Sequence, residues 1–367
     1  MTWPTGADSG SDVHVHIIGS GLIGASIGLA LVAAGVDVTL EDVDDVTAAA
    51  AQDRGAGRVA DGLHAADVVI VAIPPRLVAM VIASKQRLNL NATFMDVSSV
   101  KDGVVAEAEA LGVDLSRFVP SHPIAGRERG GPLNARGDLF RGRSWVITAT
   151  ELAKPAHVAA AESLIAACGA RPVHLTPAEH DAALALVSHL PQLLASALAS
   201  ELVDAPFDVA VLSGQGLRDS TRIADSDPHL WRDIVTANAA HIAPLVDRVR
   251  SQLDSLAAAL HSGDPGAAVE QLVADGRRGR ARIGSTHGGP ASPVDVVSVF
   301  LRDTPGELSR IFLALQHAEV NVDDLRIDHA PGQPVGVLEL TVAHGAGQAA
   351  VVALSEWRAR VAPSVSR

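Results

Sequence analysis

The chain of 367 residues contains no tyrosine, one cysteine and only three lysines. The absence of tyrosine excludes any mechanism that uses a phenolic acid, including the Tyr-Lys pair of short-chain dehydrogenases. The single Cys168 excludes an internal disulfide and any metal site built on several cysteines. A single cysteine is typical of the reducing cytoplasm, where we expect this protein.

Positive charge is also scarce, with 29 Lys and Arg against 42 Asp and Glu and a net charge of −13. That balance argues against binding to nucleic acid or to an anionic membrane, since both need a basic surface. The uncharged stretch 13–36 is as long as a membrane span, but glycines interrupt it and no Lys or Arg precedes Arg54. We therefore expect a soluble, unprocessed protein.

A glycine-rich turn follows the first apolar stretch. Gly19, Gly21 and Gly24 fit the pattern G-x-G-x-x-G between an expected strand at 13–18 and an expected helix at 25–34. In this pattern the first glycine makes the turn, the second admits a pyrophosphate and the third packs the helix on the strand. The sequence therefore predicts a dinucleotide site at the helix N-terminus, made by Gly19, Gly21, Leu22, Ile23 and Gly24.

Asp42 lies 21 residues after Gly21, beyond an expected strand at 36–40. An acidic residue at this spacing binds the adenosine ribose hydroxyls. Glu41, Asp44 and Asp45 crowd the same loop, and no base lies between Asp37 and Asp53, so a 2′-phosphate would be repelled. This favours NAD over NADP; a turn that binds another nucleotide, or none, is the alternative.

Further strands are expected at 67–73, 93–97, 118–120, 145–148 and 171–175. They complete a doubly wound α/β sheet, and the sequence predicts a Rossmann-type domain over residues 12–176. Ser99 and His122 each follow a strand end, where ligands collect in such sheets.

Residues 177–285 are predicted to form an all-α domain, in which Pro191 kinks or restarts a helix. By residue type alone, His189 is a buried helix-end histidine. Arg222 follows two glycines and Asp219, and three interpretations remain open. It is a surface charge, a partner of Asp219, or a two-pronged ligand of a substrate carboxylate.

Beyond this domain, the Arg- and Gly-rich tract 276–293 indicates a solvated linker, with residues 286–293 as its boundary, because no aromatics accompany the arginines. Strands are expected at 294–301, from 320 and at 335–342, with helices at 307–318 and 348–361. His14 and His16 are expected to bond locally rather than to bind a metal, and Cys168 to act as a small apolar residue.

Six motifs, in order over most of residues 12–285, resemble the prephenate/arogenate dehydrogenases. They are Gly19–Ser26, Asp96–Lys101, Ser121–Gly126, His180-Asp181, Ser188–Pro191 and Arg218–Ala224. The resemblance implies an NAD(P)-binding domain, a helical domain that forms a homodimer, and a site in the cleft between them. It implies NAD-dependent oxidative decarboxylation of prephenate to 4-hydroxyphenylpyruvate in tyrosine biosynthesis, without a metal. Arogenate dehydrogenation, which makes tyrosine directly, is the alternative.

The same resemblance implies roles for individual residues. His122 accepts the proton of the ring hydroxyl, Ser99 orients that hydroxyl, and His189 is a second active-site histidine. Arg222 grips the ring carboxylate, with Asp219 near it. Arg127 stands where many relatives have threonine, and either touches the side-chain carboxylate or faces solvent. This departure leaves the choice of substrate open, and we favour prephenate.

Residues 294–367 resemble an ACT domain, a small α+β regulatory module. Asp303, Pro305, Gly306, Glu307 and Leu308 occupy its ligand-binding turn. Tyrosine as a feedback ligand is the hypothesis, and a helix-capping turn without a ligand is the alternative.

Two other functions compete with this interpretation. Related two-domain dehydrogenases use a catalytic lysine in the helical domain, but Lys85, Lys101 and Lys154 all precede it. A non-catalytic protein that senses a dinucleotide and an amino acid would not need Ser99, His122, His189 and Arg222 together.

Overall fold

The computed structural model describes residues 13–60, 66–88, 91–126, 130–205, 208–283, 293–329, 335–356, 360–361 and 365–366. The chain divides into two compact units, one of residues 1–204 and 220–249 and the other of residues 205–219 and 250–367. Arg127 lies outside the described residues.

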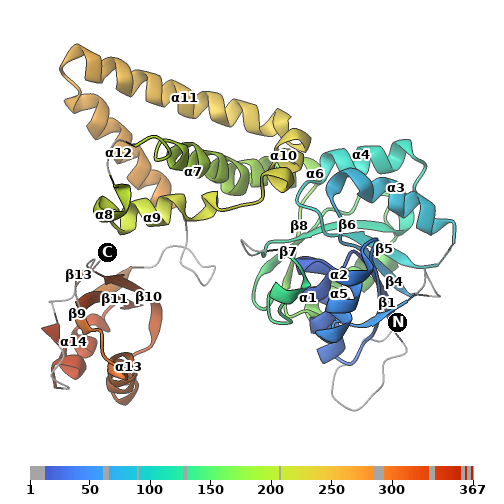
Figure 1. The fold of residues 1–367 in the computed structure, drawn as a ribbon, viewed down its shortest axis with the longest axis horizontal. Helices are drawn as coiled ribbons and strands as arrows, with labels where there is room; N and C mark the ends of the chain where they lie inside the picture. Colours follow the sequence, from blue (N-terminus) through green and yellow to red (C-terminus); the bar gives the residue numbers. More distant parts are fainter. Residues whose placement is uncertain are drawn as a thin grey trace. The chain divides into compact units, whose positions relative to one another are not determined.

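The first unit is built on an eight-stranded sheet of order β3-β2-β1-β4-β5-β6-β7-β8 (Figure 1). Its strands are β1 (His14–Ile18), β2 (Asp37–Glu41), β3 (Arg58–Val59), β4 (Val68–Val71), β5 (Thr93–Asp96), β6 (Phe118–Pro123), β7 (Ser144–Ile147) and β8 (Arg171–His174). Strands β1 to β6 are parallel, and the order reverses between β1 and β4. This is the predicted doubly wound sheet, whose ligand crevice lies at such a reversal.

One feature of the sheet differs from the expectation. Strand β7 runs antiparallel to β6. The described part of the β6–β7 connection holds only the 3-10 turn η2 (Pro132–Asn134) rather than a crossover helix. Since a parallel return needs a long crossover, the chain comes back antiparallel.

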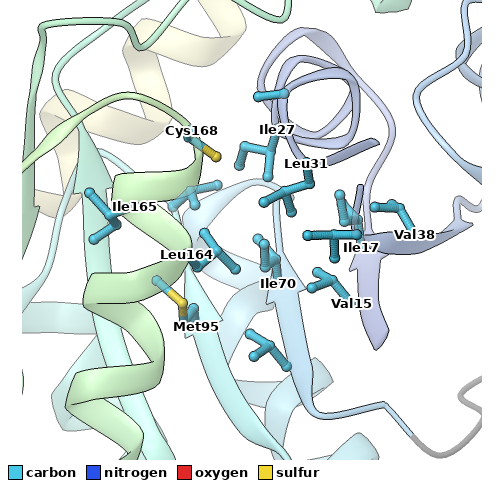
Figure 2. Close-up of a cluster of buried hydrophobic side chains, with 14 of the residues drawn as sticks. Val15, Ile17, Ile27, Leu31, Val38, Ile70, Met95, Leu164, Ile165 and Cys168 are labelled. Atoms are coloured by element: carbon cyan, nitrogen blue, oxygen red, sulfur yellow. The ribbon is translucent and has the colours of Figure 1, made fainter. Parts of the chain in front are cut away.

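Helices cover both faces of the sheet. Helices α1 (Leu22–Ala33), α2 (Asp45–Asp53) and α5 (Pro155–Ala167) pack on one face, and α3 (Pro75–Gln86) and α4 (Asp102–Ala110) on the other. Figure 2 shows Leu31 and Leu164 against Ile17 and Ile70 of the sheet. Cys168 is buried in this cluster, which confirms its apolar role, and burial raises the pKa of its thiol to about 12.

A continuous helical stretch follows, made of α6 (Pro177–Leu184), the π-turn η3 (Ala185–His189) and α7 (Leu190–Ser200). Pro191 stands in the first turn of α7, where its missing N–H costs least, and the helix restarts there through a widened turn. In the described chain only this stretch is long and apolar enough to cross a membrane. It carries His180, Asp181 and His189, which the protein buries, whereas Leu186 and Val187 of the same stretch are exposed.

The 3-10 turn η1 (Leu115–Arg117) lies between α4 and β6 of the first sheet. The remaining elements of the helical part are α8 (Val209–Leu212), α9 (Gln215–Thr221), η4 (Arg222–Ala224), α10 (Pro228–Ala237), α11 (Ala239–Ser262) and α12 (Gly266–Ala281). The tract 276–281 ends α12, so the prediction of a linker there was wrong. Arginine is a good helix former, and basic residues such as Arg278 and Arg280 are favourable in a last turn.

The second unit ends in an antiparallel sheet of order β10-β11-β9-β12, with β13 also paired to β9. Its elements are β9 (Val294–Arg302), α13 (Glu307–His317), β10 (Val322–His329), β11 (Val335–Ala343), α14 (Gly347–Glu356), β12 (Arg360–Val361) and β13 (Val365–Ser366). Both helices pack on one face of this sheet (Figure 1), with Leu315 and Leu354 against Val299 and Leu338.

The expected final helix to Val361 was wrong at its end, since α14 stops at Glu356. Arg360–Val361 instead pairs with β9 as β12. A strand edge left open exposes unpaired backbone groups, and β12 satisfies those of β9.

Candidate active site

A cavity of about 730 Å³ opens at the carboxyl ends of the sheet strands in the first unit. Gly21 of the glycine-rich turn, Ser99 after β5 and His122 of β6 line it, and Arg222 and Trp231 line it from the helical side. Residues separated by up to 210 positions are therefore brought together, and Ser99, His122 and Arg222 lie in one cavity, as the family resemblance implies.

The glycine-rich turn has the geometry of a phosphate cradle. Gly19 has φ +95°, and a Cβ on it would lie 2.3 Å from the carbonyl oxygen of Ala72. A Cβ on Gly24 would lie 1.9 Å from the carbonyl oxygen of Gly19. Gly21 has no described atom within 4 Å of its Cβ position, and it precedes the first turn of α1. The residues present thus fit a bound dinucleotide, whose pyrophosphate would take that open space.

The acidic end of this turn is organised by hydrogen bonds. Asp42 accepts from the backbone N–H of Ser20 at 2.6 Å and from that of Asp44 at 3.0 Å. Glu41 receives Lys85 Nζ at 2.6 and 2.7 Å and His16 Nε2 at 3.1 Å. The hydrogen bonds from His16 and then Lys85 lower the pKa of Glu41 to about 2.

The contact of Lys85 with Glu41 was not predicted from the sequence, because Lys85 belongs to α3, far along the chain from β2. Its single charge faces Glu41, and the loop still carries Asp42, Asp44 and Asp45. His16 Nδ1 lies 2.9 Å from Thr39 Oγ1, and His14 Nε2 2.8 Å from the same oxygen, so the expectation of local bonding is confirmed.

His122 stands at the head of a chain of hydrogen bonds. Its Nδ1 lies 2.9 Å from Nε2 of His180, whose own Nδ1 lies 2.7 Å from Oδ1 of Asp181. Burial, and then the neighbouring His180, Lys101 and His189, hold the pKa of His122 well below its usual 6.5. The imidazole is therefore neutral at neutral pH, as a general base must be.

A fully buried ion pair between Lys101 and Asp96 fixes the loop that carries Ser99. Lys101 Nζ also donates to the carbonyl oxygen of Ser121 at 2.8 Å and to Ser98 Oγ at 3.1 Å. Burial lowers the pKa of Lys101, and Asp96 opposes that shift. Removing one partner of a buried ion pair lowers the stability of a protein by roughly 3–5 kcal/mol. Because Lys101 bonds to both segments, the pair holds the Ser99 loop against the strand of His122.

His189 is buried beside the cavity rather than among its lining residues. Asn238 Nδ2 lies 3.0 Å from His189 Nδ1 and 2.8 Å from the carbonyl oxygen of Asp181. Burial lowers the pKa of His189 to about 4. The edge of its ring meets Trp231, with 6.0 Å between centroids.

Gln192 lines the cavity although it is 5% exposed, and sequence reasoning missed it. The spacing from His189 could have indicated Gln192, because residues three apart on a helix share a face and Gln192 follows His189 by three. Among the described residues its amide makes only long contacts, 3.4 Å to Ser196 Oγ and 3.5 Å to Ser226 Oγ, which suits a group that meets a ligand.

Other predicted residues lie elsewhere. Asp219 belongs to the second unit, where Gln215 Nε2 donates to it at 2.7 Å and Arg326 pairs with it at 2.9 Å. In the C-terminal sheet unit, Gly306 has φ +87° immediately before α13, and Glu307 lies 3.7 Å from Arg310.

A dinucleotide cradle and a neutral histidine in one cavity define the class of dinucleotide-dependent dehydrogenases. Residues 27–187 match the model of the prephenate dehydrogenase nucleotide-binding domain, and residues 176–274 match that of the prephenate dehydrogenase dimerization domain. The chain is 34% identical to the probable prephenate dehydrogenase NovF of Streptomyces niveus, over 89% of this chain and 93% of that protein. The chain belongs to the prephenate dehydrogenase family.

Two further relatives agree with this assignment. Cyclohexadienyl dehydrogenase of Zymomonas mobilis is 32% identical, over 68% of this chain and 89% of that protein. The crystal structure of prephenate dehydrogenase from A. aeolicus, in complex with hydroxyphenyl propionate and NAD+, is 26% identical with a TM-score of 0.66. It covers 74% of this chain and 98% of that one.

Proposed function

We propose that this chain catalyses the NAD-dependent oxidative decarboxylation of prephenate to 4-hydroxyphenylpyruvate, a step of tyrosine biosynthesis. The observation that carries the proposal is the single cavity that Ser99, His122 and Arg222 line together with the glycine-rich turn. Family membership and the NAD+ complex of the A. aeolicus relative support both the substrate and the cofactor.

His122 is the proposed base, with Ser99 as the residue that orients the ring hydroxyl. Arg222 holds the ring carboxylate, for which the planar guanidinium is suited. Bound NAD supplies the hydride acceptor. His122 takes the hydroxyl proton as the ring carbon is oxidised, and loss of carbon dioxide leaves its electron pair to make the ring aromatic. A proton returns to the same oxygen, and the gain of aromaticity drives the oxidation, so the proposed mechanism uses no metal.

Arogenate is the second candidate substrate, because a Synechocystis arogenate dehydrogenase structure is also similar. That structure is 25% identical with a TM-score of 0.62, over 73% of this chain and 99% of that one. Prephenate and arogenate differ in the side chain that carries the second carboxylate. We propose that Gln192, in the cavity, and Arg127 recognise that side chain. The place of Asp219 near Arg222 stays a prediction.

The test is an assay of pure protein with NAD or NADP and with either prephenate or arogenate, followed by NAD(P)H absorbance and product identification. We expect turnover with NAD and prephenate, giving 4-hydroxyphenylpyruvate. Absence of turnover with every combination would defeat the proposal. Faster turnover of arogenate would replace the substrate.

We also propose a cytoplasmic homodimer with a nucleotide-binding domain at 12–176, a helical domain at 177–285, a linker at 286–293 and an ACT-like module at 294–367. The match to the dimerization-domain model supports the dimer. The strand-helix-strand-strand-helix-strand order of the last module, with sheet order β10-β11-β9-β12, is that of ferredoxin-like folds, which supports the ACT assignment.

The turn of Asp303, Pro305, Gly306, Glu307 and Leu308 is the proposed tyrosine site of that module. Gly306 has a left-handed φ of +87° immediately before α13, which is compatible with a ligand-binding turn there. The proposal predicts that excess tyrosine lowers the activity of the full chain. Full activity at saturating tyrosine would contradict it.

A further inference from the structure

The pair His180-Asp181 of α6 has no role in the mechanism above. His180 is fully buried and Asp181 is 1% exposed, and neither lines the cavity. They nevertheless continue the hydrogen bonds of His122 inward, from His122 Nδ1 to His180 Nε2 at 2.9 Å and from His180 Nδ1 to Asp181 Oδ1 at 2.7 Å.

Asp181 is held as a carboxylate at the start of α4. Its Oδ1 accepts the backbone N–H of Lys101 at 2.8 Å and its Oδ2 that of Asp102 at 2.9 Å. Burial opposes ionisation, but the hydrogen bonds from His180 and from these two N–H groups lower the pKa of Asp181. A helix N-terminus also favours an anion.

The ionised carboxylate orients the first hydrogen bond of the chain. A carboxylate only accepts, so His180 must donate from Nδ1. In the form of His180 that has this one N–H, Nε2 is an acceptor and His122 donates to it from Nδ1. The nitrogen left without a proton is Nε2 of His122.

We propose that His180 and Asp181 are positioning residues that hold His122 in the tautomer whose Nε2 is free to take the substrate hydroxyl proton. This inference rests on the proposed function. When Nε2 takes that proton, His122 becomes an imidazolium whose Nδ1–H still binds His180, and the charge of Asp181 stabilises it through His180. The proton returns to the same oxygen as the ring becomes a phenol, so the buried chain needs no exit to solvent.

Three variants test the role of His180. His180→Phe keeps a ring of similar size but removes the acceptor for His122 Nδ1–H. We expect kcat to fall by roughly 10²–10⁴-fold, as for the loss of a base or of its tautomer, with KM changed little. His180→Gln offers an amide oxygen to the same N–H, and we expect at least about tenfold more activity than in His180→Phe. His174→Phe is the control, because His174 is exposed and pairs with Glu162. A His180→Phe enzyme within threefold of the unaltered kcat, or a glutamine variant no better than phenylalanine, overturns the proposal.

The tautomer is read without any turnover. Nitrogen-15 NMR of the histidine-labelled full chain, with the His122 signals assigned by their loss in His122→Asn, separates Nδ1–H from Nε2–H. We expect Nδ1–H in the unaltered chain and a mixture in Asp181→Asn. A proton on Nε2 of His122 in the unaltered chain refutes the proposed positioning of His122 by His180 and Asp181. If the chain fails to oxidise prephenate, the proposed function fails alone, since this reading does not depend on substrate.

Discussion

At the scale of the residue, the site is defined by imidazoles that the fold keeps neutral. Burial and neighbouring charges lower the pKa of His122 well below 6.5, and burial lowers that of His189 to about 4. The base is thus in its active form throughout the neutral range. We expect kcat/KM to stay level from pH 8 down to 6.5 and to fall only at lower pH, in a profile measured with saturating NAD.

The same depressed values make the fold sensitive to acid. An unfolded chain binds protons on these histidines near pH 6.5, whereas folded His189 does so near pH 4. Their contribution to stability is therefore complete above pH 6.5 and is lost as the pH falls towards 4. Thermal unfolding at pH 7.5, 6, 5 and 4 measures this loss, and we expect His189→Gln to show a weaker dependence on pH than the unaltered chain. An equal dependence would contradict the assignment.

Arg222 tests the recognition of the ring carboxylate. We expect Arg222→Lys to keep the charge but lose the two-pronged contact, which raises KM for prephenate by roughly 10–100-fold with little change in kcat. Arg232→Lys is the matched control, because Arg232 is exposed, pairs with Asp233 and lies outside the cavity lining. Equal KM values in the two variants would remove Arg222 from this role.

Residue types and spacing left the role of Arg222 open, and it was the resemblance of the local motifs to a family that predicted Ser99, His122 and Arg222 in one site; all three line the cavity. The sequence did not predict the contact of Lys85 with Glu41, or the hydrogen bond of His122 with His180. Those contacts join segments about 40 to 60 residues apart, and only the packing of helices on the sheet brings them together.

At the scale of the element, two glycines of one turn separate folding from cofactor binding. A Cβ on Gly24 would meet the carbonyl oxygen of Gly19 at 1.9 Å, whereas a Cβ on Gly21 meets open space. We expect Gly24→Ala to lower the melting temperature of the chain. We expect Gly21→Ala to keep that temperature but to weaken NAD binding by at least about tenfold, since the methyl group occupies the place of the pyrophosphate. Calorimetry and NAD titration measure the two effects. Equal melting temperatures for both variants would contradict this division.

Most strands were predictable because parallel strands covered on both faces read as continuous apolar runs, as in β4. The direction of β7 and the short strand β12 were not. Both are set by what the chain must pair with, a strand edge in each case, and an isolated sequence segment does not carry that information.

At the scale of the whole molecule, the helical part has few buried residues of its own. No described residue of α12 is buried, and Leu253 and Leu260 of α11 are 54% and 56% exposed. Burying a leucine side chain contributes roughly 1.5–3 kcal/mol of stability, so we expect a second copy of the chain to cover this surface.

We expect sedimentation to show a dimer, and Leu253→Asp combined with Leu260→Asp to raise its dissociation constant by at least about 100-fold. Leu88→Asp, at an exposed leucine after α3, is the control and should leave the dimer intact. A dimer unchanged by the double substitution would place the interface elsewhere.

The central claim is that one cavity oxidises prephenate with His122 as its base. The most direct measurement compares NADH formation from prephenate by the unaltered chain and by His122→Asn, with the binding of NAD and prephenate measured for both. The account predicts one 4-hydroxyphenylpyruvate for each NADH in the unaltered chain, and a rate roughly 10²–10⁴-fold lower in His122→Asn with both ligands still bound. An undiminished rate in His122→Asn would contradict it.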